Sequence, residues 1–100
     1  AAFANKDVNE LKEIVDRGKE KLQSGIIILG TNNGGKAIFV VGVTKDLISK
    51  VKAGEIVKVA AQVAGGNGGG RPDFAQAGGK DGNAVKEAVD KAFEFVNEKL

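Results

Sequence analysis

The chain is 100 residues long, 42% apolar and 28% charged, which is typical of one small globular domain with a single hydrophobic core. It contains neither cysteine nor histidine, and this excludes disulfides, thiolate metal sites and the most common general base. We therefore expect no catalytic residue, no metal and no cofactor in it. Its apolar runs are far shorter than the roughly 20 residues of a membrane span, so we expect no membrane partner. No secretory signal is visible and cysteine is lacking, so we expect a cytoplasmic location.

The net charge is only +2, but it is unevenly distributed. Residues 36–58 carry five lysines against two carboxylates, a local net charge of +3. These lysines are Lys36, Lys45, Lys50, Lys52 and Lys58. Such an excess attracts nucleic acid, or it only keeps a surface solvated.

Apolar periodicity and capping residues predict the helices. In chain order these are residues 5–22, a short turn over residues 44–50, residues 53–64 and residues 83–100. The first is expected to be capped by Asn5 or Asp7, the short turn by Thr44, and the last helix by Asp81 or Asn83. These helices would cover a sheet with their apolar faces.

The last helix has a continuous apolar face, whose burial we expect to stabilise the fold. Its members are Val85, Ala88, Val89, Ala92, Phe93, Val96 and Leu100. Phe95 lies off this face. We expect it to pack at the flank of the helix, or to contact another domain or subunit.

Two β-branched runs, residues 26–31 and 36–43, predict strands, and the Asn-Asn-Gly-Gly sequence between them accepts the positive φ of a hairpin turn. A third strand is expected over residues 73–77. The order helix, hairpin, helix, strand, helix predicts a small α/β domain. Its mixed sheet would consist of the hairpin and the third strand, covered by three or four helices.

Residues 65–79 contain seven of the fifteen glycines, the only proline and one of the two arginines. We expect a loop from a helix into a strand, with its backbone free to face solvent or a ligand. Successive N–H groups in such a loop can bind an anion, and Arg71 would be a planar, permanently charged donor beside them. The alternative is that the glycines only end a helix and form a turn. The sequence lacks the standard glycine motifs for nucleotides.

Residues 68–79, Gly-Gly-Gly-Arg-Pro-Asp-Phe-Ala-Gln-Ala-Gly-Gly, closely resemble the glycine-rich signature of C-Ala, the C-terminal domain of bacterial alanyl-tRNA synthetases. Residues 52–57, Lys-Ala-Gly-Glu-Ile-Val, also look like that family. Phe74 is a departure, because methionine is more usual there. The resemblance implies a nucleic-acid-binding module, related to the domain that accompanies DHH-type phosphoesterases, that contacts the outer corner of tRNA.

The resemblance also implies that residues 1–100 are a single domain, a C-terminal fragment of a longer chain that is an alanine–tRNA ligase. The fragment itself would not be an enzyme. It would link aminoacylation with editing, and its partners would be tRNA(Ala) and the catalytic and editing domains of the same polypeptide.

We expect the glycine backbone to approach phosphate or ribose and Arg71 to be the chief side-chain contact. The expected nucleic-acid-binding residues are Gly68, Gly69, Gly70, Arg71, Gln76 and Lys80. Asp73 would orient Arg71 or cap a turn. Only one lysine of residues 36–58 needs to face the same way to help.

Two other functions stay open on the sequence. One is a structural or oligomerisation module that forms a homo-oligomer through the last helix. The other is an accessory domain of a DHH-type phosphoesterase, in which the same loop would hold the end of a nucleic acid or a nucleotide. In that family we would expect histidine near the position of Arg71.

Overall fold

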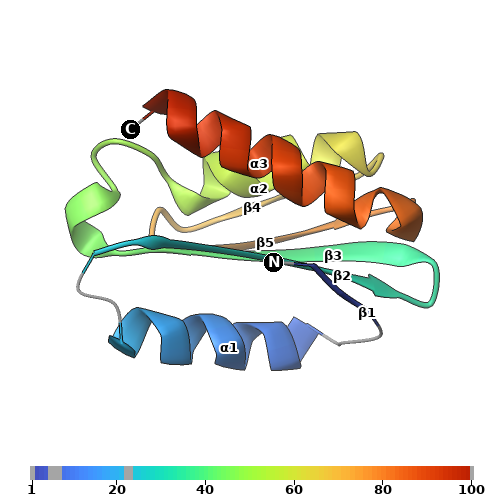
Figure 1. Cartoon of the computed structure of the whole chain (residues 1–100), viewed down its shortest axis with the longest axis horizontal. Coiled ribbons are helices and arrows are strands. Elements are labelled where there is room, and N and C mark those ends of the chain that lie inside the picture. The colour runs from blue at the N-terminus through green and yellow to red at the C-terminus, as the bar shows by residue number, and fades with distance from the viewer. Residues whose placement is uncertain (1, 5–7, 22–23, 100) are drawn as a thin grey trace.

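The computed structural model describes residues 2–4, 8–21 and 24–99 and has a five-stranded mixed sheet with helices on both faces (Figure 1). The strands are β1 (Ala2–Ala4), β2 (Ile26–Asn33), β3 (Lys36–Val43), β4 (Asn67–Gly70) and β5 (Phe74–Gly79). The helices are α1 (Val8–Lys21), α2 (Ala53–Val63) and α3 (Val85–Lys99), with 3₁₀ turns η1 (Lys45–Leu47) and η2 (Gly82–Ala84). The predicted α/β class and mixed sheet are confirmed.

The sheet has the order β1-β2-β3-β5-β4, in which β1 is parallel to β2 and all other neighbours are antiparallel. The sequence prediction of a hairpin plus a third strand therefore missed two strands, the short β1 and the glycine strand β4. Both are edge strands of three and four residues. Strands this short carry little periodic signal in the sequence.

The expected loop with a free backbone is wrong for residues 67–70, which pair with β5. Glycine usually weakens a strand, but here β4 approaches β5 too closely for side chains on β4 at positions 68 and 70. A Cβ on Gly68 would lie 2.5 Å from Ala77 Cα, and one on Gly70 would lie 2.7 Å from Ala75 Cα. These glycines are therefore what permits the pairing.

The predicted hairpin between β2 and β3 is confirmed. Asn33 pairs with Lys36, and the two turn residues, Gly34 and Gly35, have φ of 63° and 89°. The Asn32 side chain supports the turn by accepting a hydrogen bond from the Gly35 N–H at 3.0 Å. Glycine is required at both turn positions because side chains disfavour this backbone conformation.

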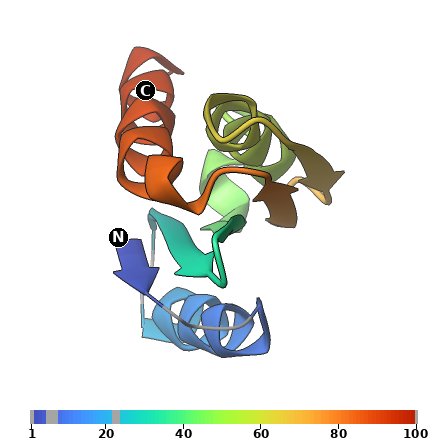
Figure 2. The same ribbon diagram turned by 90° about the vertical axis from the view of Figure 1, so that its right-hand side faces the viewer.

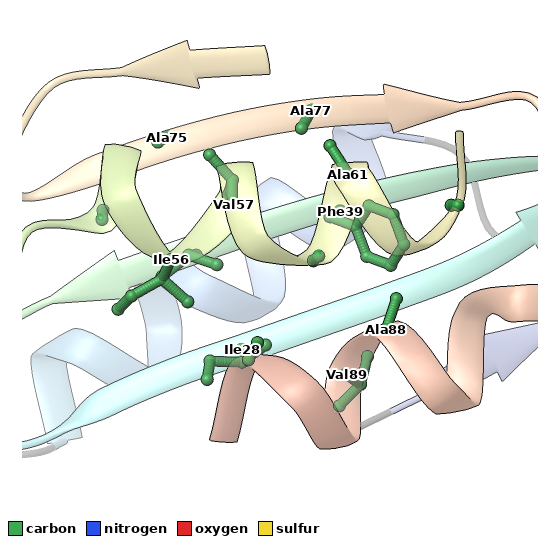
Figure 3. Close-up of a cluster of buried hydrophobic side chains, with 14 of the residues drawn as sticks. Ile28, Phe39, Ile56, Val57, Ala61, Ala75, Ala77, Ala88 and Val89 are labelled. Atoms are coloured by element: carbon green, nitrogen blue, oxygen red, sulfur yellow. The ribbon is translucent and has the colours of Figure 1, made fainter. Parts of the chain in front are cut away.

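Both faces of the sheet are covered, which explains why β2 has no polar side chain over residues 26–30 and β3 has none over residues 37–43. One face packs against α2 and α3, where Phe39 and Ile56 are fully buried (Figure 3). The other face packs against α1 through a smaller cluster of Leu11, Val15, Leu29 and Val40. Along β3, Phe39 and Val40 thus belong to opposite cores.

Helix α2 lies close to the sheet because its inner face is rich in alanine. Ala60, Ala61 and Ala64 are fully buried. After Ala64, Gly65 takes a φ of 72°, and the chain leaves the helix directly into β4. Small side chains on α2 and glycines on β4 together bring the helix and the edge strand into close contact.

The apolar face of α3 is confirmed with one correction. Val85, Ala88 and Val96 are buried, but Phe93 is 44% exposed whereas Phe95 is half-buried against the core. At about 100° per residue, the two phenylalanines flank the buried face on opposite sides. Only Phe95 packs against the larger core, between the sheet and helices α2 and α3. The sequence could not distinguish the two sides of the helix.

Some predicted features fall outside the described residues, namely the caps Asn5 and Asp7, the helix end at Leu22, and Leu100. Asp81 accepts a hydrogen bond from the Asn83 N–H at 3.0 Å and thereby caps η2, the 3₁₀ turn that leads into α3, and not α3 itself. Thr44 precedes η1, but its side chain makes no capping hydrogen bond to the backbone of that turn. The cap predicted at Thr44 is therefore wrong.

The Thr44 hydroxyl instead belongs to a polar cluster that joins the start of β2 to the end of β3. It donates to Asp46 Oδ1 at 2.6 Å and accepts from the Gly25 N–H at 3.0 Å. Ser24 donates to Asp46 Oδ2 at 2.5 Å. The hydrogen bonds from Ser24 and Thr44 lower the pKa of Asp46 below its usual value.

Because the pKa of Asp46 is lower in the folded state, the unfolded chain binds its proton first as the pH falls. The stability that Asp46 contributes is thus present above its ordinary pKa of 3.8 and is lost as the pH falls below it. We expect Asp46→Asn to lose less stability than wild type between about pH 6 and about pH 2.5. The free energy of unfolding, measured with urea across this pH range, checks the prediction, with Asp90→Asn on α3 as control. Equal pH dependence in both variants would contradict the assignment.

Candidate nucleic-acid interface

The glycine strand β4 is the outer edge of the sheet and lies on the far side of α2 from α3 (Figure 2). The Arg71 N–H donates to the Phe74 carbonyl at 3.0 Å, so these residues form a hydrogen-bonded pair. Hydrogen-bonded and non-hydrogen-bonded pairs alternate along an antiparallel ladder. The backbone N–H and C=O of Gly69 therefore point toward β5, whereas those of Gly68 and Gly70 point to the free edge. Asn67 Oδ1 accepts from the Gly68 N–H at 2.9 Å.

The turn between β4 and β5 is held from two directions. The Ala53 N–H at the start of α2 donates to the Pro72 carbonyl at 2.8 Å, and the Val43 N–H at the end of β3 donates to the Asp73 carbonyl at 2.9 Å. The glycine strand is therefore anchored at this end by α2 and by the central strand of the sheet.

A groove of about 290 Å³, which we call the α2 groove, runs between β4 and the first turns of α2. Its lining comprises Lys52, Gly54, Glu55, Lys58, Gly69, Gly70 and Pro72. A Cβ on Gly54 would lie 3.4 Å from the Gly70 carbonyl oxygen, so the Gly70 backbone lies close to the start of α2, and both residues line this groove. Two lysines and one glutamate give the lining a net positive charge.

A second groove of about 490 Å³, which we call the α1 groove, lies on the other side of β4. Its lining comprises Lys12, Asp16, Gly69, Gly70, Arg71, Phe74, Ala75 and Gln76. One wall thus comes from α1 and the floor from the β4–β5 hairpin. This lining too is net positive, with two cations against one carboxylate.

Arg71 is 77% exposed and lies beside Asp73, with 3.7 Å between Arg71 Nε and Asp73 Oδ1. The other carboxylate oxygen of Asp73 is 3.7 Å from Lys19 Nζ. Lys19 also donates to the Asp73 carbonyl at 3.1 Å. Of the two roles expected for Asp73, this geometry favours orienting Arg71. The contact at Nε leaves the exposed guanidinium accessible to a ligand.

The structure brings most of the expected residues together. Gly69, Gly70, Arg71 and Gln76 line the α1 groove, and Gly68 and Gln76 line an adjoining hollow of about 400 Å³. Lys80 follows the end of β5, whereas Arg71 pairs opposite its first residue. Six residues of strand, roughly 20 Å, thus separate Lys80 from Arg71.

Two of the five lysines in residues 36–58 share a groove with the glycines, Lys52 and Lys58. Lys36 pairs opposite Asn33 at the β2–β3 turn, and Lys45 belongs to η1. The sequence reasoning missed Lys12 and Lys19 of α1, because their charge pattern looked like an ordinary solvated helix face. Lys19 lies 54 residues from its partner Asp73, and no local pattern reports such a contact.

Gly69 differs from its neighbours in the strand. Gly68 and Gly70 are needed for close pairing with β5, but a Cβ on Gly69 would meet nothing within 4 Å. Gly69 also has no left-handed φ that would favour glycine. Neither packing nor backbone conformation therefore explains why this position lacks a side chain.

Other kinds of site find no support in the described ranges. Residues 2–4, 8–21 and 24–99 contain no group of three or more metal-ligating side chains. Over the same residues, no helix is long and apolar enough to cross a membrane.

The profile of the DHHA1 domain family matches residues 1–98. The chain belongs to this family. Among solved structures, it superimposes on the C-Ala domain of Aquifex aeolicus alanyl-tRNA synthetase with a TM-score of 0.84 and 32% identity, covering all of this chain and 86% of that one.

Curated relatives show the same relationship. The chain is 52% identical over 92 residues to the alanine–tRNA ligase of Oceanobacillus iheyensis, covering 91% of this chain and 10% of the relative. It is 48% identical over 101 residues to that of Acetivibrio thermocellus, covering 100% and 12%. The chain thus spans about a tenth of the length of these relatives. The resemblance to C-Ala inferred from residues 52–57 and 68–79 is confirmed.

Proposed function

We propose that this domain binds tRNA(Ala) as part of a cytoplasmic alanyl-tRNA synthetase. The remainder of that longer chain would supply aminoacylation and editing, and this domain would contact the outer corner of the tRNA and link the two activities. The observation that carries the proposal is the meeting of two net-positive grooves at a glycine strand, with Arg71 exposed beside it. The similarity to C-Ala supports it.

The chemistry of the site suits recognition of an RNA backbone. Lysine and arginine side chains with exposed backbone groups contact phosphate and 2′-hydroxyl groups, and they read shape and charge more than base sequence. We therefore expect salt-dependent binding, with a preference for folded tRNA over single strands. Single nucleotides should compete poorly, which separates this function from that of a phosphoesterase accessory domain.

The test is fluorescence anisotropy of labelled tRNA(Ala) titrated with the domain at several salt concentrations. We expect Arg71→Ala to weaken binding about tenfold, because one charge-assisted contact is lost. Its melting temperature should be unchanged, since an exposed ion pair contributes little to stability. Lys86→Ala, an exposed lysine on α3 away from both grooves, is the control. Equal binding by wild type and Arg71→Ala would remove Arg71 from the interface.

A further inference from the structure

The glycine strand separates the two grooves, and Gly69 and Gly70 line both of them. We propose that the sugar–phosphate backbone of the bound RNA crosses over β4 at Gly69, so that its phosphates lie in both grooves. This inference rests on the proposed function and adds to it the path of the RNA and three lysines outside the glycine signature.

The charges are arranged on both sides of the crossing. In the α1 groove, Lys12 and Arg71 contact phosphate from one side. In the α2 groove, Lys52 and Lys58 contact phosphate from the other side. Each groove also holds one carboxylate, so neither lining alone accumulates more than a single net positive charge. A polyanion that occupies both grooves meets all four cations.

The width of the ridge fits this path. At Gly69 the ridge consists of backbone alone, because no side chain adds to its width. Neighbouring phosphates of one nucleic-acid chain can therefore lie on either side of it. Along the ridge, the Gly68 carbonyl and the backbone groups of Gly70 point to the free edge, while the Gly68 N–H already donates to Asn67 Oδ1. The 2′-hydroxyl of RNA both donates and accepts hydrogen bonds and suits such an edge.

The crossing also explains Gly69. A side chain at this position would project into open space, in the path of the RNA, and would hold the two backbones apart. Glycine permits the close approach of another backbone. Binding of the RNA therefore requires glycine at position 69, whereas pairing with β5 requires glycine at positions 68 and 70.

The decisive variant is Gly69→Val. Valine suits a strand and its Cβ would meet nothing within 4 Å here, so the melting temperature should stay equal or rise. Affinity for labelled tRNA(Ala) should nevertheless fall about tenfold or more, because the backbones can no longer touch. Binding as tight as wild type would overturn the crossing at Gly69.

The two-sided contact is tested by salt dependence. Lys12→Gln and Lys58→Gln should each reduce the slope of log affinity against log salt concentration by about 0.7–0.9, whereas Lys86→Gln should not. A Lys12→Gln slope equal to that of Lys86→Gln would overturn the contact in the α1 groove.

Failure of the two proposals can be told apart. If the wild-type domain does not bind tRNA(Ala) at low salt, the proposed function fails and this inference fails with it. If the wild type binds and Arg71→Ala binds weakly, but Gly69→Val and Lys12→Gln bind normally, only the path over the strand is wrong.

Discussion

Replacing Phe39 with alanine is expected to lower the free energy of unfolding by about 3–5 kcal/mol. Phe39 lies on the central strand β3, is fully buried and packs in the larger core (Figure 3). Removing its ring leaves a cavity between the sheet and the two helices that cover it, and neighbours as small as Ala61 and Ala88 cannot fill it. Thermal or urea unfolding followed by circular dichroism measures the loss.

Phe93→Ala is the matched control for this prediction. The same substitution removes a side chain that is 44% exposed, so the loss should be well under half of that at Phe39. Because the sequence prediction grouped Phe93 with the buried face of α3, this pair of variants also tests the correction that the structure makes. Similar losses at both positions would contradict the described core.

The second large effect is expected at Gly68. Its replacement by alanine would place a Cβ 2.5 Å from Ala77 Cα and 2.8 Å from the Gln76 carbonyl oxygen. These are backbone neighbours that cannot rotate away, so β4 must separate from β5. We expect a loss of about 1–3 kcal/mol in the free energy of unfolding, with faster hydrogen exchange of the β4 and β5 amides.

Gly69→Ala, one residue away, provides the control. Since its Cβ would meet nothing within 4 Å, stability should stay unchanged or rise by about 0.4–1 kcal/mol through the unfolded state. If both variants lost the same stability, the different roles given to the two glycines would be wrong. Together with the binding of Gly69→Val, this comparison separates what the strand needs from what the ligand needs.

The local features of the chain could be predicted from its sequence. β-Branched runs around two consecutive glycines specify the β2–β3 hairpin, because only glycine takes the two positive φ values at little cost. Helical periodicity specifies α1, α2 and α3, and the absence of cysteine and histidine restricts the chemistry. The glycine-rich signature and Arg71 identified both the family and the centre of the candidate interface.

Tertiary structure alone decided the form of the glycine run. Glycine has no intrinsic preference for a strand, so residues 67–70 become one only because β5 presents an edge whose alanines allow close approach. Likewise, the sequence treated the charged face of α1 as solvated. Packing of α1 against β3 places Lys12 beside the β4–β5 hairpin. The hydrogen bond from Lys19 to Asp73 joins residues that are 54 positions apart. Residues so far apart in the sequence become neighbours only when the sheet forms, because that contact depends on the order of all the strands between them.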